Sequence, residues 1–105
     1  MSEIEAVVVA AGLSSRAGGW KPGFKIGNFT VIERCILGMV PFCSRVIVIG
    51  GAQFHRLQGL LTKEKYPMVE LFYNRDYRKG MLASAREGFR RVRTDRFFFI
   101  PGDYP

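Results

Sequence analysis

The sequence has few of the residue types that build disulfide frameworks or metal clusters. Its 105 residues include two cysteines, Cys35 and Cys43, and one histidine, His55. The spacing of the cysteines fits no metal or redox motif, so we expect both to behave as small apolar residues of a cytoplasmic protein. His55 lies beside Phe54 on an expected surface helix, and we assign it no role.

Long apolar segments are also absent. No apolar run approaches the roughly 20 residues that span a bilayer. The run from Ala6 to Ala11 is too short for the apolar part of a signal peptide, and the residues before it are acidic where a signal would be basic. With a hydrophobic fraction of 48% and a charged fraction of 24%, the composition is that of a soluble globular protein. We therefore expect no membrane association and a single domain over residues 1–105.

The sequence does contain an alternation of strand and helix patterns. The Val-rich run Ala6–Ala11 is typical of a central parallel strand that is covered on both faces. Thr30 and Glu33 have the spacing of a capping box before a helix that Pro41 ends. The further expected elements are strands over Arg45–Ile49, Met68–Tyr73 and Arg96–Ile100 and helices over Gln53–Lys65 and Gly80–Val92. This β-α-β-α-β-α-β order predicts an α/β fold, a Rossmann-like, doubly wound and mainly parallel sheet.

The same patterns predict which side chains form the core. Helical spacing places Leu57, Leu60 and Leu61 inward on the second helix. On the third helix it places Leu82, Ala85, Phe89 and Val92 inward, and the aromatic run Phe97–Phe99 is expected to be a core strand.

The glycine-rich segment 12–29 is predicted to be a long loop, of the kind that is usually functional or disordered. Its small residues would let backbone N–H groups approach an anion, and Arg16 and Lys21 supply positive charge. It matches neither the G-x-G-x-x-G fingerprint nor the Walker A motif. On the residues alone, a phosphate cradle and a surface loop with solvated cations remain open in about equal measure.

A second candidate segment, Gly102-Asp103-Tyr104-Pro105, follows the last expected strand. Parallel sheets bind ligands beyond the carboxyl ends of their strands, so this segment and the first loop are placed to face one crevice. By itself, Asp103 would normally be a turn aspartate, because Gly-Asp in a Pro-flanked turn is common.

Four motifs, in order, resemble those of one family. Residues 10–21 resemble the signature A-A-G-x-S-S-R-M-G-x-x-K, with Ala17 in place of the methionine, and Thr30–Arg34 resembles the start of the first helix of the family. Asn74–Ser84 is similar to N-x-x-Y-x-x-G-M-x-x-S, and Gly102–Pro105 resembles the metal motif G-D-x-P. The family is that of the MobA-like nucleotidyltransferases, which includes the molybdenum cofactor cytidylyltransferases and guanylyltransferases.

The resemblance implies nucleotidyl transfer on a Rossmann-like sheet. Arg16 and Lys21 would hold the triphosphate as catalytic residues, and Asp103 would bind the cofactor Mg²⁺, which suits a site of few carboxylates and phosphate oxygens. For Ser84 the alternative to a nucleotide contact is a helix cap. The nucleotide-binding residues implied are Ala10, Ala11, Gly12, Ser14, Ser15, Arg16, Lys21 and Ser84.

The resemblance also bears on substrates and extent. The A-A-G-x-S start favours CTP over GTP, with a phosphorylated small molecule such as molybdopterin as acceptor. The family continues beyond G-D-x-P, so we expect this chain to be the nucleotide-binding part of an incomplete family domain. The sheet edge exposed in that case invites pairing, and we expect self-association.

Two other function classes remain open. One is a non-catalytic nucleotide-binding or interaction module with the same fold. The other is a nucleic-acid-binding protein, which the net charge of +7 and an expected helical face of Arg86, Arg90 and Arg93 would suit. The sequence has no helix-turn-helix, RNP or KH signature, so we expect a solvated basic surface and no nucleic acid.

Overall fold

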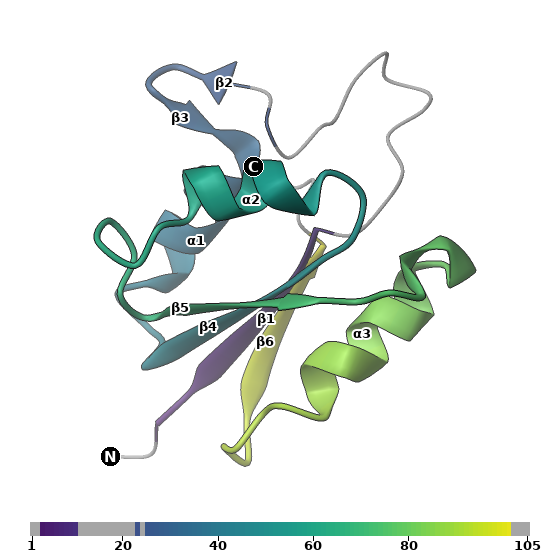
Figure 1. Cartoon of the computed structure of the whole chain (residues 1–105). Coiled ribbons are helices and arrows are strands. Elements are labelled where there is room, and N and C mark those ends of the chain that lie inside the picture. The colour runs from purple at the N-terminus through teal and green to yellow at the C-terminus, as the bar shows by residue number, and fades with distance from the viewer. Residues whose placement is uncertain (1–2, 11–22, 24, 102–105) are drawn as a thin grey trace.

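The computed structural model describes residues 3–10, 23 and 25–101 (Figure 1). Its centre is a sheet of four parallel strands in the order β5-β4-β1-β6. Strand β1 (Glu5–Ala10) lies between β4 (Arg45–Gly50) and β6 (Phe97–Pro101), and β5 (Val69–Tyr73) pairs with the outer side of β4. The predicted α/β, Rossmann-like parallel sheet is therefore confirmed.

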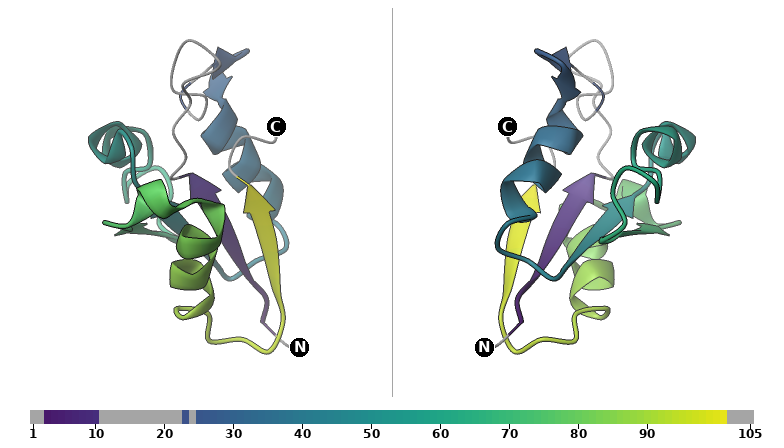
Figure 2. Two further views of the ribbon diagram at one scale, coloured as in Figure 1. Left: turned by 90° about the vertical axis from the view of Figure 1, so that its right-hand side faces the viewer. Right: turned by 90° about the vertical axis from the view of Figure 1, so that its left-hand side faces the viewer.

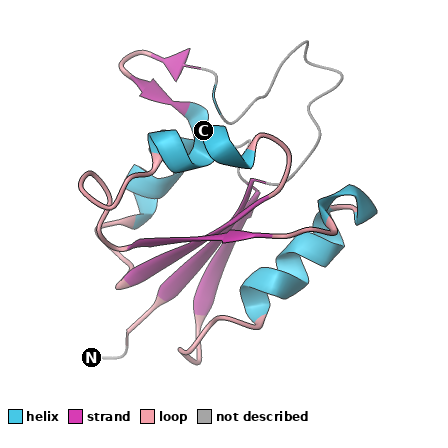
Figure 3. Ribbon diagram, in the orientation of Figure 1, coloured by secondary structure: helices cyan, strands magenta, loops and turns pink. Residues whose placement is uncertain are grey.

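Helices cover both faces of this sheet (Figures 2 and 3). On one face, α1 (Val31–Met39) and α2 (Phe54–Leu60) bury a core that includes Val8 of β1. On the other face, α3 (Met81–Phe89) packs on a core that includes Val7. Alternate side chains of β1 thus enter opposite cores, which explains why the run Glu5–Ala10 is buried throughout. None of the helices in the described ranges has the length and apolar content that a bilayer crossing requires.

The capping box at the start of α1 is present as predicted. Thr30 Oγ1 accepts from the Glu33 amide at 3.3 Å, and Glu33 Oε1 accepts from the Thr30 amide at 3.1 Å. The hydroxyl of Tyr66 donates to the second Glu33 oxygen, so this buried carboxylate joins the start of α1 to the segment before β5. Burial raises the pKa of Glu33, but hydrogen bonds from Tyr66 and Thr30 outweigh it and hold that pKa below its usual value.

The expected loop 12–29 is only partly irregular in its described residues. Strands β2 (Lys25–Ile26) and β3 (Phe29–Thr30) form a small antiparallel hairpin. Gly27 takes a φ of 70° in its turn, a conformation that glycine adopts without strain. Both α2 and α3 are shorter than the sequence predicts. Helix α2 ends at Leu60 and α3 ends at Phe89. Arg93 therefore lies outside α3, and the expected helical face of Arg86, Arg90 and Arg93 is wrong.

Some expected core residues are exposed. Leu82 is 64% exposed and Phe89 41%, whereas Ala85 is buried, so the inward face of α3 is narrower than predicted. The run Phe97–Phe99 forms β6 as expected, but its side chains are 38–44% exposed because β6 is an outer strand with β1 as its neighbour among the described residues. The prediction that these rings belong to the core is wrong.

Candidate functional site

The carboxyl ends of the four parallel strands lie at one edge of the sheet, here called the carboxyl edge. Ala10 ends β1 opposite Gly50 of β4, and Gly50 lies opposite Tyr73, the last residue of β5. On the other side, Val9 lies opposite Pro101 at the end of β6. The strands that precede the first loop and Asp103 are thus neighbours, as a shared crevice requires.

Most predicted site residues lie outside the described ranges: Ala11, Gly12, Ser14, Ser15, Arg16, Lys21 and Asp103. Ala10 is described, and its small side chain is 3% exposed at the strand end. The roles that the resemblance assigns to the predicted site residues remain predictions. Within the described residues, no group of three or more His, Cys, Asp or Glu side chains is arranged to hold a metal ion.

Two glycines shape the carboxyl edge between β4 and β5. A Cβ added to Gly50 would lie 2.6 Å from Cδ1 of Phe54, and one added to Gly51 would lie 2.3 Å from Cβ of Tyr77. Any larger residue there would force the side chain of Phe54 or of Tyr77 to shift. The sequence marks this pair as the end of a strand, and the structure supplies the reason for it.

Asn74 organises the turn that follows β5. Its amide N–H donates to the Gly50 carbonyl at 2.9 Å, and its side-chain oxygen accepts from the Asp76 amide at 3.0 Å. Its side-chain nitrogen donates to Oγ of Ser84 at 3.0 Å, and both side chains are buried. Asn74 therefore fixes the turn against β4 and α3 at once. Its position at the head of the motif Asn74–Ser84 is the signal that could have marked it.

Ser84 is neither exposed nor a helix cap. It is 1% exposed in α3, and the cap of this helix is Gly80 without a side-chain hydrogen bond. The alternative role as a cap is thus wrong. Contact with a nucleotide remains a prediction, and the hydrogen bond from Asn74 shows that Ser84 also holds the turn in place.

An aromatic and cationic rim lies along the β5 side of the carboxyl edge. The rings of Phe54 and Tyr73 are 5.3 Å apart, and those of Tyr73 and Tyr77 are 6.3 Å apart. The guanidinium of Arg78 lies 5.7 Å from the Tyr77 ring centre, and Lys79 is 73% exposed at 3.9 Å from Asp76. Parallel sheets generally bind ligands at their carboxyl edge, and exposed cations there suit a phosphate-bearing ligand.

The opposite edge is formed by the first residues of the strands and is here called the amino edge. Its strand-starting charged side chains pair with one another. Arg45 Nη1 lies 2.9 Å from Oε2 of Glu5, and Arg45 Nε bonds Glu70. The other oxygen of Glu5 accepts from the amides of Arg93 and Thr94. Burial raises the pKa of Glu5, but these hydrogen bonds, with the one from Arg45, outweigh it and lower that pKa below its usual value.

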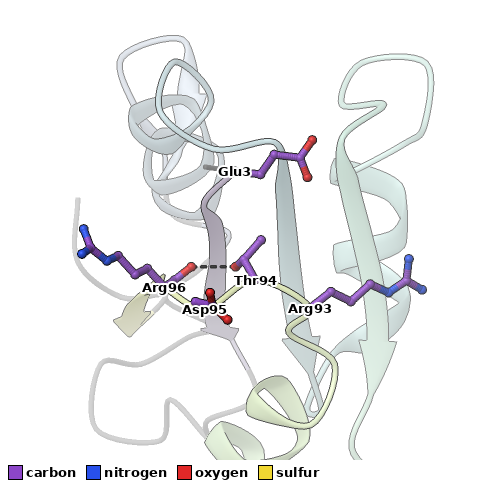
Figure 4. A pocket seen from close by; sticks show the side chains of 5 residues that line it. All are labelled: Glu3, Arg93, Thr94, Asp95 and Arg96. Atoms are coloured by element: carbon purple, nitrogen blue, oxygen red, sulfur yellow. Dashed lines mark hydrogen bonds between the residues drawn. The ribbon is translucent and has the colours of Figure 1, made fainter. Parts of the chain in front are cut away.

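A hollow of about 470 Å³ also lies at the amino edge, lined by Glu3, Arg93, Thr94, Asp95 and Arg96 (Figure 4). The side chains of Arg93 and Arg96 point away from one another, and the Thr94 hydroxyl donates to the Arg96 carbonyl at 2.6 Å. Two carboxylates share the hollow. The cations do not converge on one point, so this hollow does not make a phosphate site.

The chain is similar to known nucleotidyltransferases in sequence and in fold. The chain is 32% identical over 105 residues to the molybdenum cofactor cytidylyltransferase of Escherichia coli K12, covering all of this chain and 54% of that protein. A nucleotidyl transferase from Methanothermobacter superposes with a TM-score of 0.84 at 25% identity, covering 96% of this chain and 50% of the other. For a CTP:phosphocholine cytidylyltransferase from Streptococcus pneumoniae the TM-score is 0.75 at 25% identity, with 97% and 46% covered.

The chain spans about half the length of these relatives. The family model for the MobA-like NTP transferase domain matches residues 6–105. Because that match includes almost every residue, the chain belongs to the MobA-like NTP transferase domain family.

Proposed function

We propose that this chain binds a nucleoside triphosphate, CTP in preference to GTP, at the carboxyl edge for transfer of a nucleotidyl group. The observation that carries the proposal is the 32% identity over the whole chain to a molybdenum cofactor cytidylyltransferase. The phosphorylated acceptor is then a molecule of the molybdopterin type. We place the protein in the cytoplasm on the same ground.

Each residue of the proposed site has a role in binding or transfer. Backbone groups of residues 10–12 and the hydroxyls of Ser14 and Ser15 bind the nucleoside, and Ser84 is the further residue assigned to the nucleotide. Arg16 and Lys21 hold the triphosphate in line with the acceptor phosphate. An acceptor oxygen forms a bond to the α-phosphorus while the bond from that phosphorus to the β-phosphate oxygen breaks, and pyrophosphate leaves.

Asp103 is the residue proposed to hold Mg²⁺. When bound, Mg²⁺ supplies neutralisation of the phosphate charge during the transfer. Asp103 follows the strand next to β1, so its carboxylate would share the edge with the triphosphate. One carboxylate together with phosphate oxygens is a ligand set that Mg²⁺ commonly takes.

The test is calorimetric titration of CTP, GTP and ATP with Mg²⁺ into the protein and into Asp103→Ala. We expect Mg²⁺-dependent binding of CTP that the substitution weakens at least tenfold. Asp95→Ala, an exposed aspartate at the amino edge, is the matched control and should bind as the unchanged protein does. Binding of no triphosphate, or equal loss in both variants, would refute the proposed site.

A second candidate function is a non-catalytic nucleotide-binding module. It shares the fold and the proposed nucleotide site and differs from the first proposal only in lacking turnover. Steady release of pyrophosphate from CTP in the presence of a molybdopterin-type acceptor would establish turnover. Binding of CTP without such release would favour the module.

A further inference from the structure

Asn74 and Ser84 form a buried polar pair at the carboxyl edge. Asn74 directly follows the last residue of β5, and Figure 1 shows the turn after β5 leading into α3, the helix that carries Ser84. Asn74 is 5% exposed and Ser84 1%, and Nδ2 of Asn74 lies 3.0 Å from Oγ of Ser84. Buried polar groups in proteins are nearly always hydrogen-bonded, so every donor of this pair should have a partner.

The turn fixes the direction of the hydrogen bond between Asn74 and Ser84. The backbone N–H of Asp76 can only donate, and it donates to the Asn74 side chain at 3.0 Å. The atom that accepts from it must be the oxygen Oδ1, which assigns the NH₂ group of Asn74 to the side of Ser84. Oγ of Ser84 therefore has to accept from Asn74, and the proton of its own hydroxyl is left for another acceptor.

The proton of the Ser84 hydroxyl has no acceptor in the described part of the chain. A serine inside a helix commonly donates to the carbonyl four residues earlier, which for Ser84 is that of Gly80. That bond does not form here, although both residues are described. A buried donor without a partner is costly, and a ligand at the carboxyl edge can supply the missing acceptor.

We propose that Asn74 is a positioning residue for base recognition, which holds Ser84 as a hydrogen-bond donor to N3 of cytosine. This inference rests on the proposed function, in which CTP binds at the carboxyl edge. N3 of cytosine has a lone pair and accepts, whereas N3 of uracil carries a proton and donates. O2 accepts in both bases, so a donor to O2 would not distinguish them. A donor held at N3 therefore admits CTP and rejects UTP, because UTP would leave two buried donors facing one another.

The substitution Asn74→Asp reverses the polarity of the pair and keeps its shape. The two side chains have nearly the same size, and one carboxylate oxygen can still accept from the Asp76 amide. The other carboxylate oxygen can only accept, so Ser84 must donate its proton to the side chain at position 74. Oγ of Ser84 then presents a lone pair, in place of a proton, to the base.

The experiment is calorimetric titration of CTP and UTP, each with Mg²⁺, into the unchanged protein, Asn74→Asp and Ser84→Ala. We expect the unchanged protein to bind CTP more tightly than UTP, and this preference to fall at least about tenfold in both variants. In Asn74→Asp the binding of UTP gains relative to CTP, because its N3–H finds an acceptor. The double variant should have the same preference as Ser84→Ala alone, because Asn74 acts through the Ser84 hydroxyl.

Asn28→Asp is the matched control, because it makes the same change of side chain and charge on the exposed turn between β2 and β3. Its added charge repels both triphosphates alike, so its preference for CTP over UTP should match that of the unchanged protein. Circular dichroism of each variant verifies that it is folded, and Ser84→Ala carries the test if Asn74→Asp does not fold.

The ratio of the two affinities separates base recognition from a purely structural role, which would weaken CTP and UTP equally. An unchanged ratio in Asn74→Asp or in Ser84→Ala would overturn the inference, as would equal binding of CTP and UTP by the unchanged protein. In these cases binding of CTP would leave the proposed function standing. Binding of neither nucleotide by the unchanged protein would overturn both.

Discussion

The charged residues that begin the strands at the amino edge are partnered differently from those of the turn at the carboxyl edge. At the amino edge, Glu5 and Arg45 start neighbouring strands, pair with one another and are each bonded to further partners. At the carboxyl edge, Arg78 and Lys79 are exposed around a turn that Asn74 holds from beneath. Charges that satisfy one another hold the fold together, whereas charges that face solvent are available to a ligand. The comparison separates the charges that stabilise the fold from the edge at which we propose that the nucleotide binds.

The largest expected effect comes from breaking the amino edge with Glu5→Gln. The side chain of Glu5 is 4% exposed, and its loss leaves Arg45 with one carboxylate partner in a half-buried setting. Removing one member of a buried pair costs about 3 kcal/mol of the free energy of unfolding. Urea denaturation measures it. Glu87→Gln, whose pairs with Arg90 and Arg91 are more exposed, is the control and should cost under about 0.5 kcal/mol.

The same variant should alter the response to acid. The folded pKa of Glu5 lies below its unfolded value, so the stability that it contributes is present above the unfolded pKa and is lost as the pH falls through the folded one. Between pH 7 and about pH 3, the free energy of unfolding of Glu5→Gln should therefore fall less steeply with pH than that of the unchanged protein. An unchanged slope would mean that Glu5 is not the carboxylate that matters at this edge.

The next effect concerns Tyr66, which supports the start of α1 near the carboxyl edge. Burial and its hydrogen bond to Glu33 raise the pKa of Tyr66 to about 12. Since this exceeds the ordinary tyrosine pKa of 10.0, the stability from neutral Tyr66 is present below pH 10 and is lost as the pH rises through 12. The difference in stability between the unchanged protein and Tyr66→Phe should shrink by about 2–3 kcal/mol over that range. Persistence of the whole difference at high pH would contradict the assigned hydrogen bond.

The smallest expected effect sharpens the comparison at the level of single cations. Lys79→Gln at the carboxyl edge should weaken CTP binding severalfold, and the loss should fade in high salt, because the contact is an exposed one. Arg90→Gln, at the end of α3 nearest the amino edge, should leave CTP binding unchanged. Both variants should keep the stability of the unchanged protein. Equal losses of affinity would show that net charge, not position, governs binding.

Local patterns were sufficient to predict much of the fold. The valines of β1 and the pair Thr30 and Glu33 indicate a buried strand and a capped helix through interactions with near neighbours in the sequence. The sequence did not reveal that the side chains of Phe97–Phe99 are exposed, because an aromatic run has the same pattern in a central strand and in an outer one. The pairing of Arg45 with Glu5 is also hidden, since it depends on which strands become neighbours.

For a related reason, the sequence predicted some features of the candidate site and not others. The motif residues Arg16, Lys21 and Asp103 lie outside the described ranges, so their roles rest on the family. Asn74 begins the motif Asn74–Ser84, but its role follows from contacts with Gly50 and Ser84 that form only after β4, β5 and α3 have assembled. A single residue that links three elements leaves no periodic signal along the chain.

The strand order has a consequence for how the chain folds. β1 is synthesised before β4 and β6, yet Val7 lies opposite Ile47 of β4 on one side and opposite Phe99 of β6 on the other. Contacts between such distant residues form slowly, because a long loop must close before they gain anything. During synthesis the apolar β1 can therefore pair on one side only, with β4, until β6 has left the ribosome. We expect the nascent chain to be most prone to aggregation in that interval.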